Sequence, residues 1–194
     1  MKTHENQKAE ANLDPVDELG AAITRAWTEC GIALRPHMNG QNEGEREGHY
    51  LLVLLEFFYF FFHMASRYAL LILGQGGREK LIKELLPLLI DYAVKICFAR
   101  FDTDYQQHIR GRLPIGISER DAYYADGDLR APESGAKSEP VWVVTMLIRR
   151  INTQSGKPPR DPEIMREVIK VAVDQVIALD LERRMIAIKH MARE

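Results

Sequence analysis

The sequence predicts an all-α protein, a helical bundle of about five main helices with a long buried central hairpin. Apolar residues recur through several long stretches at the spacing of an amphipathic helix. In one stretch, residues 50–73, the six consecutive aromatic residues at 57–62 surround a helix with apolar side chains, and Glu56, His63 and Arg67 interrupt the stretch. The only clear strand-like run, VWVVT at 141–145, has no other strand with which to pair. We therefore expect helices packed on helices.

The first helix is expected over residues 15–34. Asp14 followed by Pro15 is typical of a helix start, and Pro36 marks the far end. The apolar residues between them form a single stripe at helical spacing, so another element must cover it.

The central hairpin is expected from a second helix over 45–73 and a third helix from Arg78 through Phe98. Glycines between 74 and 77 supply the positive φ angles that a reversal needs. Pro87 removes one backbone hydrogen bond and crowds the preceding turn, so we expect a kink or break in the third helix.

Helical patterns return after a polar stretch rich in glycine and proline. Residues 114–139 are expected to be a mobile connection with one short helix, at 118–125. A helix over 141–152 is preferred to a strand because Pro140 suits a first helical position. Asp161 then caps a last helix that continues to about residue 190.

These elements divide the chain into four parts of a single domain. Residues 1–13 are predicted to be a disordered tail, and 14–113 an N-terminal helical core. The connection at 114–139 then leads to 140–194, a C-terminal helical pair that packs on the core.

Composition argues against several classes of protein. The 194-residue chain has a formal net charge of −2 and a pI near 6.3, so a nucleic-acid partner is not expected. Cys30 and Cys97 lie far apart within apolar patterns, as reduced core cysteines of a cytoplasmic protein do. The polar residues 1–14 lack the apolar region of a secretory signal, so we expect a cytoplasmic location.

Polar residues within the apolar helices are the candidate binding site. Glu56, His63 and Arg67 share one face of the second helix. In an antiparallel hairpin, three residues of the third helix lie level with this face and offer opposite charges. Arg67 is then expected to face Glu84, Glu56 to face Lys95, and Asp91 to lie about one turn from His63. A satisfied network between helices is the preferred interpretation, because an unpaired buried ion is costly.

Two other interpretations of these residues stay open. A ligand or hydrolytic pocket in the bundle core would use His63, Arg67 and Asp91 as its polar groups. Alternatively, two copies of the second helix would pack antiparallel near Phe61 and Phe62, and the aromatic residues would be buried in a homodimer interface.

A membrane-associated helix is a further alternative for residues 51–73. Their length approaches the ~20 residues that a bilayer requires. Each central charge costs about 2.5–3.5 kcal/mol on insertion, so Glu56 and Arg67 largely cancel the apolar gain. A membrane is therefore not the expected partner.

Motifs for catalysis, cofactors or metals are not found in the sequence. Asp104 and His108, four residues apart, would offer at most two metal ligands, and such pairs are common on solvated surfaces. We therefore expect no catalytic residues, cofactor or metal. The sequence favours a non-catalytic interaction or regulatory protein that acts as a homodimer, with an unidentified protein as a further partner.

Overall fold

A computed structural model describes residues 14–129, 139–155 and 161–191, with side chains for 14–125, 144–155 and 161–191. The all-α prediction is confirmed, because the described residues form helices and no strand. The elements in chain order are α1 (Pro15–Leu34), the 3₁₀ helix η1 (Arg35–His37), α2 (Glu43–Cys97), α3 (Thr103–Leu129), α4 (Glu139–Gln154), α5 (Pro162–Leu179) and α6 (Leu181–Met191).

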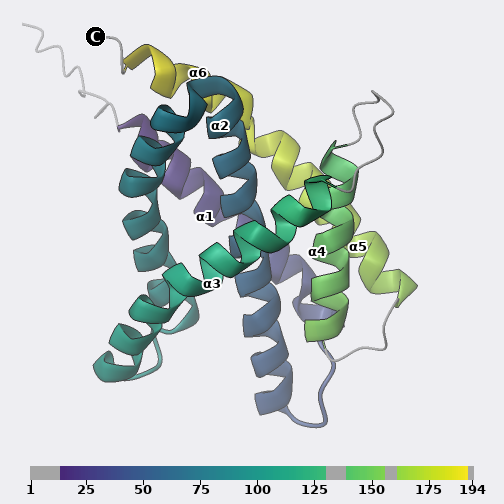
Figure 1. Ribbon diagram of the computed structural model, residues 1–194. Coiled ribbons are helices and arrows are strands. Elements are labelled where there is room, and N and C mark those ends of the chain that lie inside the picture. Colours follow the sequence, from purple (N-terminus) through teal and green to yellow (C-terminus); the bar gives the residue numbers. More distant parts are fainter. Residues whose placement is uncertain (1–13, 130–138, 156–160, 192–194) are drawn as a thin grey trace, which may run out of the picture.

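The long helix α2 reverses direction at Gly74, as the sequence predicts. Gly74 has φ 75° and ψ 179°, and it is the one position inside α2 where the backbone leaves helical geometry. Figure 1 shows two arms on either side of this reversal, which we call the first arm (43–73) and the second arm (75–97). The expected break at Pro87 is wrong, because the second arm stays helical through it.

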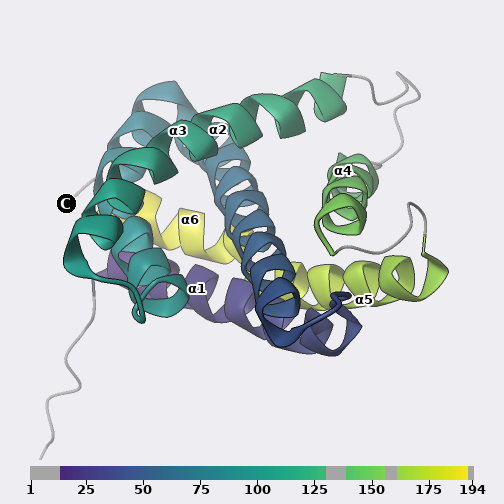
Figure 2. The ribbon, with the colours of Figure 1, turned by 90° about the horizontal axis from the view of Figure 1, so that it is seen from below.

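Two helices cross both arms of α2 from opposite sides. In Figure 1, α1 passes behind the two arms and α3 passes diagonally in front of them, and Figure 2 shows the same layers from below. The α3 backbone comes close to the first arm at Gly116, where an added Cβ would lie 2.7 Å from the Tyr59 hydroxyl. Glycine at this position therefore allows α3 to lie against α2.

The aromatic residues of the first arm form the centre of the core. Five phenylalanines between 57 and 62 are buried within a single chain, and the Trp27 ring of α1 lies 5.3 Å from that of Phe58. These rings are therefore covered without a second copy of the helix. The symmetric contact expected near Phe61 and Phe62 is not what buries them.

Helix α3 differs most from the sequence prediction. Residues 114–129, expected to belong to a connection with one short helix, continue a helix of 27 residues that contains Pro114. The short helix expected at 118–125 is found as part of α3. Leu113, Ile117 and Tyr124 are buried, so packing on α2 supports the helix beyond the part that the sequence predicts. Residues 130–138 and the tail 1–13 lie outside the described residues.

The C-terminal region holds one helix more than expected. The helix predicted at 141–152 is confirmed as α4. The last predicted helix is divided at Asp180, whose φ of 43° and ψ of 54° end α5 in the left-handed conformation. Aspartate adopts this conformation more readily than most residues, so a helical pattern can continue in sequence across the break.

One helix of the described residues, α2, is long and apolar enough to cross a membrane by length and composition alone. In the structure, 61% of the most apolar 18-residue segment of α2 is buried inside the protein. A core helix of a soluble bundle meets the same criteria.

Gly74→Ala is expected to destabilise the protein by about 1–3 kcal/mol, because an L-residue is strained at this φ and ψ. Gly76→Ala is the matched control. It lies two residues further on, its added Cβ meets nothing within 4 Å, and its backbone is helical, so it is expected to stabilise by about 0.5–1 kcal/mol. Urea unfolding at one protein concentration measures both, and equal effects would contradict the strain at Gly74.

Candidate functional site

Polar side chains line the contact between α2, α3 and α4 and form a network whose centre is buried and whose arginines stay partly exposed. We call this network the polar seam. Both arms of α2 contribute to it, α3 supplies its middle part, and α4 closes one end. Its members are Glu56, His63, Ser66, Arg78, Arg120, Asp121, Tyr124, Arg150 and Gln154.

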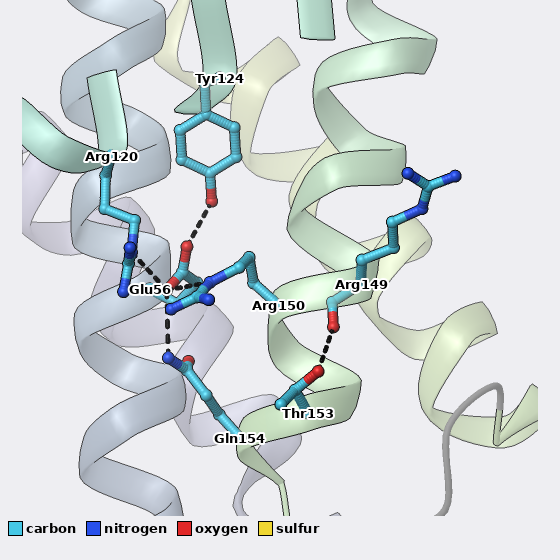
Figure 3. A network of polar contacts seen from close by, with 7 residues as sticks. All are labelled: Glu56, Arg120, Tyr124, Arg149, Arg150, Thr153 and Gln154. Atoms are coloured by element: carbon cyan, nitrogen blue, oxygen red, sulfur yellow. Dashed lines mark hydrogen bonds and ion pairs between the residues drawn. The ribbon is translucent and has the colours of Figure 1, made fainter. Parts of the chain in front are cut away.

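Glu56 is the central acceptor of the polar seam (Figure 3), and its side chain is fully buried. The Tyr124 hydroxyl donates to Oε1 at 2.8 Å. Three nitrogens donate to Oε2, from Arg120 at 3.3 Å, Arg150 at 3.4 Å and Gln154 at 3.3 Å. Four donors from two helices therefore surround one carboxylate of a third helix.

The donors come in pairs because of helical spacing. Arg120 and Tyr124 are four residues apart on α3, and Arg150 and Gln154 are four residues apart on α4, so each pair projects from one helix face. Both arginine side chains stay partly exposed at 24% and 28%, which limits the cost of placing two guanidinium groups here. The charge of Glu56 is thus compensated without burying two further ions completely.

Tyr124 joins the two halves of the polar seam. Burial and the nearby negative charge of Glu56 hold the pKa of its hydroxyl well above the ordinary value. The hydroxyl therefore stays protonated and donates to Glu56. The Tyr124 ring also contacts the His63 ring, with ring centroids 5.4 Å apart.

His63 and Asp121 form the second half of the polar seam. His63 Nδ1 donates to Asp121 Oδ1 at 2.7 Å, and Arg78 Nη2 donates to Asp121 Oδ2 at 3.2 Å. Burial alone raises the pKa of Asp121, but the hydrogen bond from His63 and the charges of Arg78 and Arg67 outweigh it and lower that pKa. Asp121 is therefore an ionised carboxylate at neutral pH, and it joins the two arms of α2 through α3.

The predicted site residues separate into two groups in the structure. Glu56 and His63 lie in the polar seam, and the charge of Arg67 acts on Asp121 at its edge. The shared face expected for these three residues is therefore found. The other three predicted residues, Glu84, Asp91 and Lys95, are exposed on the second arm and lie outside the seam.

The expected pairing across the hairpin is wrong for Glu56 and for Asp91. Glu56 bonds to donors of α3 and α4 in place of Lys95, and Asp91 forms an ion pair with Arg110 of α3 instead of approaching His63. The physical reason is the crossing of α3 in front of both arms (Figure 1), which brings a polar helix to faces that the hairpin alone would have to satisfy.

Sequence reasoning missed the partners on α3 and α4. One signal for them was present: a buried carboxylate on the first arm requires donors, and pairs of donors four residues apart occur at 120/124 and 150/154. The sequence predicts a short helix at 118–125 but places it in a mobile connection, so it does not indicate that the pair at 120/124 packs on the core.

The chemistry available in the polar seam is that of a structural brace. A histidine oriented by a carboxylate is the base and its positioning group in nucleophilic catalysis. However, Ser66, the hydroxyl of the same network, is 3% exposed and accepts a hydrogen bond from Arg78 Nε at 2.8 Å. Its hydroxyl is therefore engaged and closed to a substrate.

Metal binding finds no support among the residues with described side chains, because no three His, Cys, Asp or Glu side chains of that set gather in a metal-binding arrangement. Asp104 and His108, the one pair singled out in the sequence, are both exposed on α3. Two ligands on one helix face are fewer than a stable metal site needs.

Two pockets lined by described residues lie apart from the polar seam. A pocket of about 510 Å³ lies where α1, the reversal of α2 and α6 meet, and its charged lining residues include Lys80, Glu84 and Lys189. A second, more open one of about 550 Å³ lies between the first turns of α2 and α3, beside Leu52 and Tyr105. Neither contains His63, Arg67 or Asp91, which the core-pocket interpretation requires.

The fold and the polar seam define an all-α bundle braced by a buried ionic network. Comparison with known proteins finds no matching protein family, no similar curated protein and no similar solved structure. Functional inference therefore depends on the chemistry of this chain.

Glu56→Ala is expected to destabilise the protein by about 3 kcal/mol, because it leaves two arginines and a buried tyrosine hydroxyl without their acceptor. The control is Glu84→Ala, which removes the same group from an exposed position of the same helix and is expected to change stability by less than about 0.5 kcal/mol. Equilibrium unfolding in urea measures both. A Glu56→Ala effect as small as that of the control would mean that these donors do not depend on Glu56 for compensation.

Asp121→Asn is expected to cost about 1.5–3 kcal/mol at pH 7, because it removes a charged acceptor from His63 and Arg78. The pKa of Asp121 is lowered from its ordinary value of 3.8, so the unfolded chain binds the proton at a higher pH than the folded chain does. Its contribution is present above that ordinary pKa and is lost as pH falls through the lower folded value.

The stability difference between wild type and Asp121→Asn should therefore shrink from pH 7 towards pH 3, as measured by thermal unfolding. Asp104→Asn, at an exposed position of the same helix, serves as the control and should follow the wild type across the range. A difference that does not depend on pH would rule out the ionised Asp121.

Proposed function

We propose that the protein is a non-catalytic helical interaction protein that acts as a homo-oligomer. The charged groups of its polar seam bind one another, and the described part of the surface presents exposed apolar side chains. Another protein is the partner that fits such a surface, because contiguous exposed apolar groups mark sites of protein association.

One observation carries this proposal, an exposed apolar stripe on α5. Ile169 is 43% exposed, Val173 39% and Ile177 71%, and the three are four residues apart on one side of the helix. Single exposed apolar residues are common on proteins, but three aligned on one helix leave a face that water solvates poorly. Association with another protein surface would cover this face.

The polar seam supports a structural reading of the core over a catalytic one. A catalytic group needs access to a substrate, whereas Glu56 and His63 are each 1% exposed and hydrogen-bonded to α3. In a rigid bundle, buried charged groups are paired or hydrogen-bonded with one another. A rigid body of this kind presents its surface in one fixed arrangement.

A cytoplasmic location is part of the proposal, and the two cysteines support it. Cys30 and Cys97 are both free and buried. Burial raises the pKa of the Cys97 thiol to about 12 and that of Cys30 further, so both stay protonated and are poor nucleophiles. Buried unpaired cysteines are typical of proteins in a reducing compartment.

Light scattering after size exclusion, at micromolar concentration, tests the proposal. We expect twice the 22.2-kDa mass of one chain, with and without mild detergent. A monomer under both conditions would overturn the homo-oligomer, and aggregates that only detergent disperses would favour the membrane interpretation of α2.

A further inference from the structure

We infer that the homo-oligomer is a two-fold dimer in which α5 of one chain packs antiparallel against α5 of a second copy, with the axis at Val173. This inference rests on the proposed homo-oligomer and specifies its interface. It follows from the order of side chains along the exposed face of α5.

The exposed face of α5 has an apolar centre and a charge of opposite sign at each end. At 100° per residue, Arg166, Ile169 and Ile177 lie within about 40° of Val173 around the helix, and Asp180 is the residue that ends α5 beyond them. Arg166 precedes Val173 by seven residues and Asp180 follows it by seven, so each charge lies about 10 Å from the centre along the axis. Both charged residues are exposed.

This order is complementary to itself when the helix is reversed. In an antiparallel contact centred on Val173, each Ile169 meets Ile177 of the second copy, and each Arg166 meets its Asp180. One two-fold axis thus creates an apolar centre flanked by two identical ion pairs, as an isologous interface requires. A parallel contact would place Arg166 against Arg166 and Asp180 against Asp180, so charge selects the antiparallel arrangement.

The two terminal charges are available for a second chain. Among the residues whose side chains the structure describes, neither Arg166 nor Asp180 forms an ion pair. Other exposed charges of the surface do find partners within the chain, as Arg35 does with Glu47 and Asp91 with Arg110. The intermolecular contact would supply the missing partner at both ends of the stripe.

The inner side of α5 is already used by the fold. Ile164, Val168, Ala172 and Leu179 are buried on it. Helix α5 packs on α1 and on α4, and it lies at the periphery of the bundle in Figures 1 and 2. The face centred on Val173 therefore points away from the core, and a second chain can approach it without disturbing the fold.

Cysteine cross-linking tests the position of the axis. Val173→Cys places a thiol on the axis, where it meets its own copy, and both native cysteines are buried and should not react. We expect a short bismaleimide to convert most of this variant into covalent dimer at micromolar concentration. Leu71→Cys is the control, because Leu71 is 68% exposed on α2, away from the stripe, and should stay uncross-linked.

Two charge-introducing variants test the apolar centre and the ion pairs. Ile177→Glu should raise the dimer dissociation constant at least tenfold without unfolding the chain, because Ile177 is 71% exposed. Arg166→Glu places two like charges at each end of the interface and should weaken the dimer at low salt and less at high salt. Leu71→Glu and Lys83→Glu are their controls at exposed positions of α2, and both should keep the wild-type mass.

Failure of this inference can be told apart from failure of the proposed function. A wild-type dimer that does not cross-link at Val173→Cys and tolerates Ile177→Glu would overturn the α5 interface and leave the homo-oligomer intact. A wild-type monomer would overturn both. Equal cross-linking of the variants at 173 and 71 would show random collision and would also reject the axis.

Discussion

The Glu56 carboxylate has no contact with solvent, so its charge has to be met by donors inside the protein. This requirement links three helices, because the donors come from α3 and α4 while the carboxylate belongs to α2. A buried ion pair is weak evidence for net stability, but it is sensitive to geometry, since a displaced donor leaves a charge uncompensated. The polar seam therefore specifies how α3 and α4 lie against α2 more than it contributes net free energy.

The reversal at Gly74 creates the surface on which this arrangement is built. It turns one long apolar helix into two arms that α1 crosses on one side and α3 on the other (Figures 1 and 2). Aromatic rings of the first arm pack towards both neighbours, Phe58 against Trp27 of α1 and Phe60 against Tyr124 of α3. The polar contacts of Glu56 and His63 are made on the side towards α3. With both sides covered, the surface available for association lies on peripheral helices such as α5.

Much of the fold could be predicted from sequence because its signals are local. The cap at Asp14, the reversal at Gly74 and the cap at Asp161 each depend on a few neighbouring residues, and all three occur in the structure. Two members of the polar seam were accessible in the same way, since helical spacing places Glu56 and His63 on one face. Their partners were not, because α3 is stabilised by packing and contains the proline and glycines of a typical loop.

The sequence by itself determined the helical class, the reversal of the central helix and the existence of a buried polar face that needs partners. These properties depend on backbone preferences and on the cost of burying charge, which act within a few residues. Only the tertiary structure decided that Asp121 and Arg150, far along the chain, bind residues of the polar face. It also decided that Asp91 pairs with Arg110 and lies outside that face. Which charges meet depends on how helices cross, and crossing is set by the packing of whole surfaces, which no local pattern records.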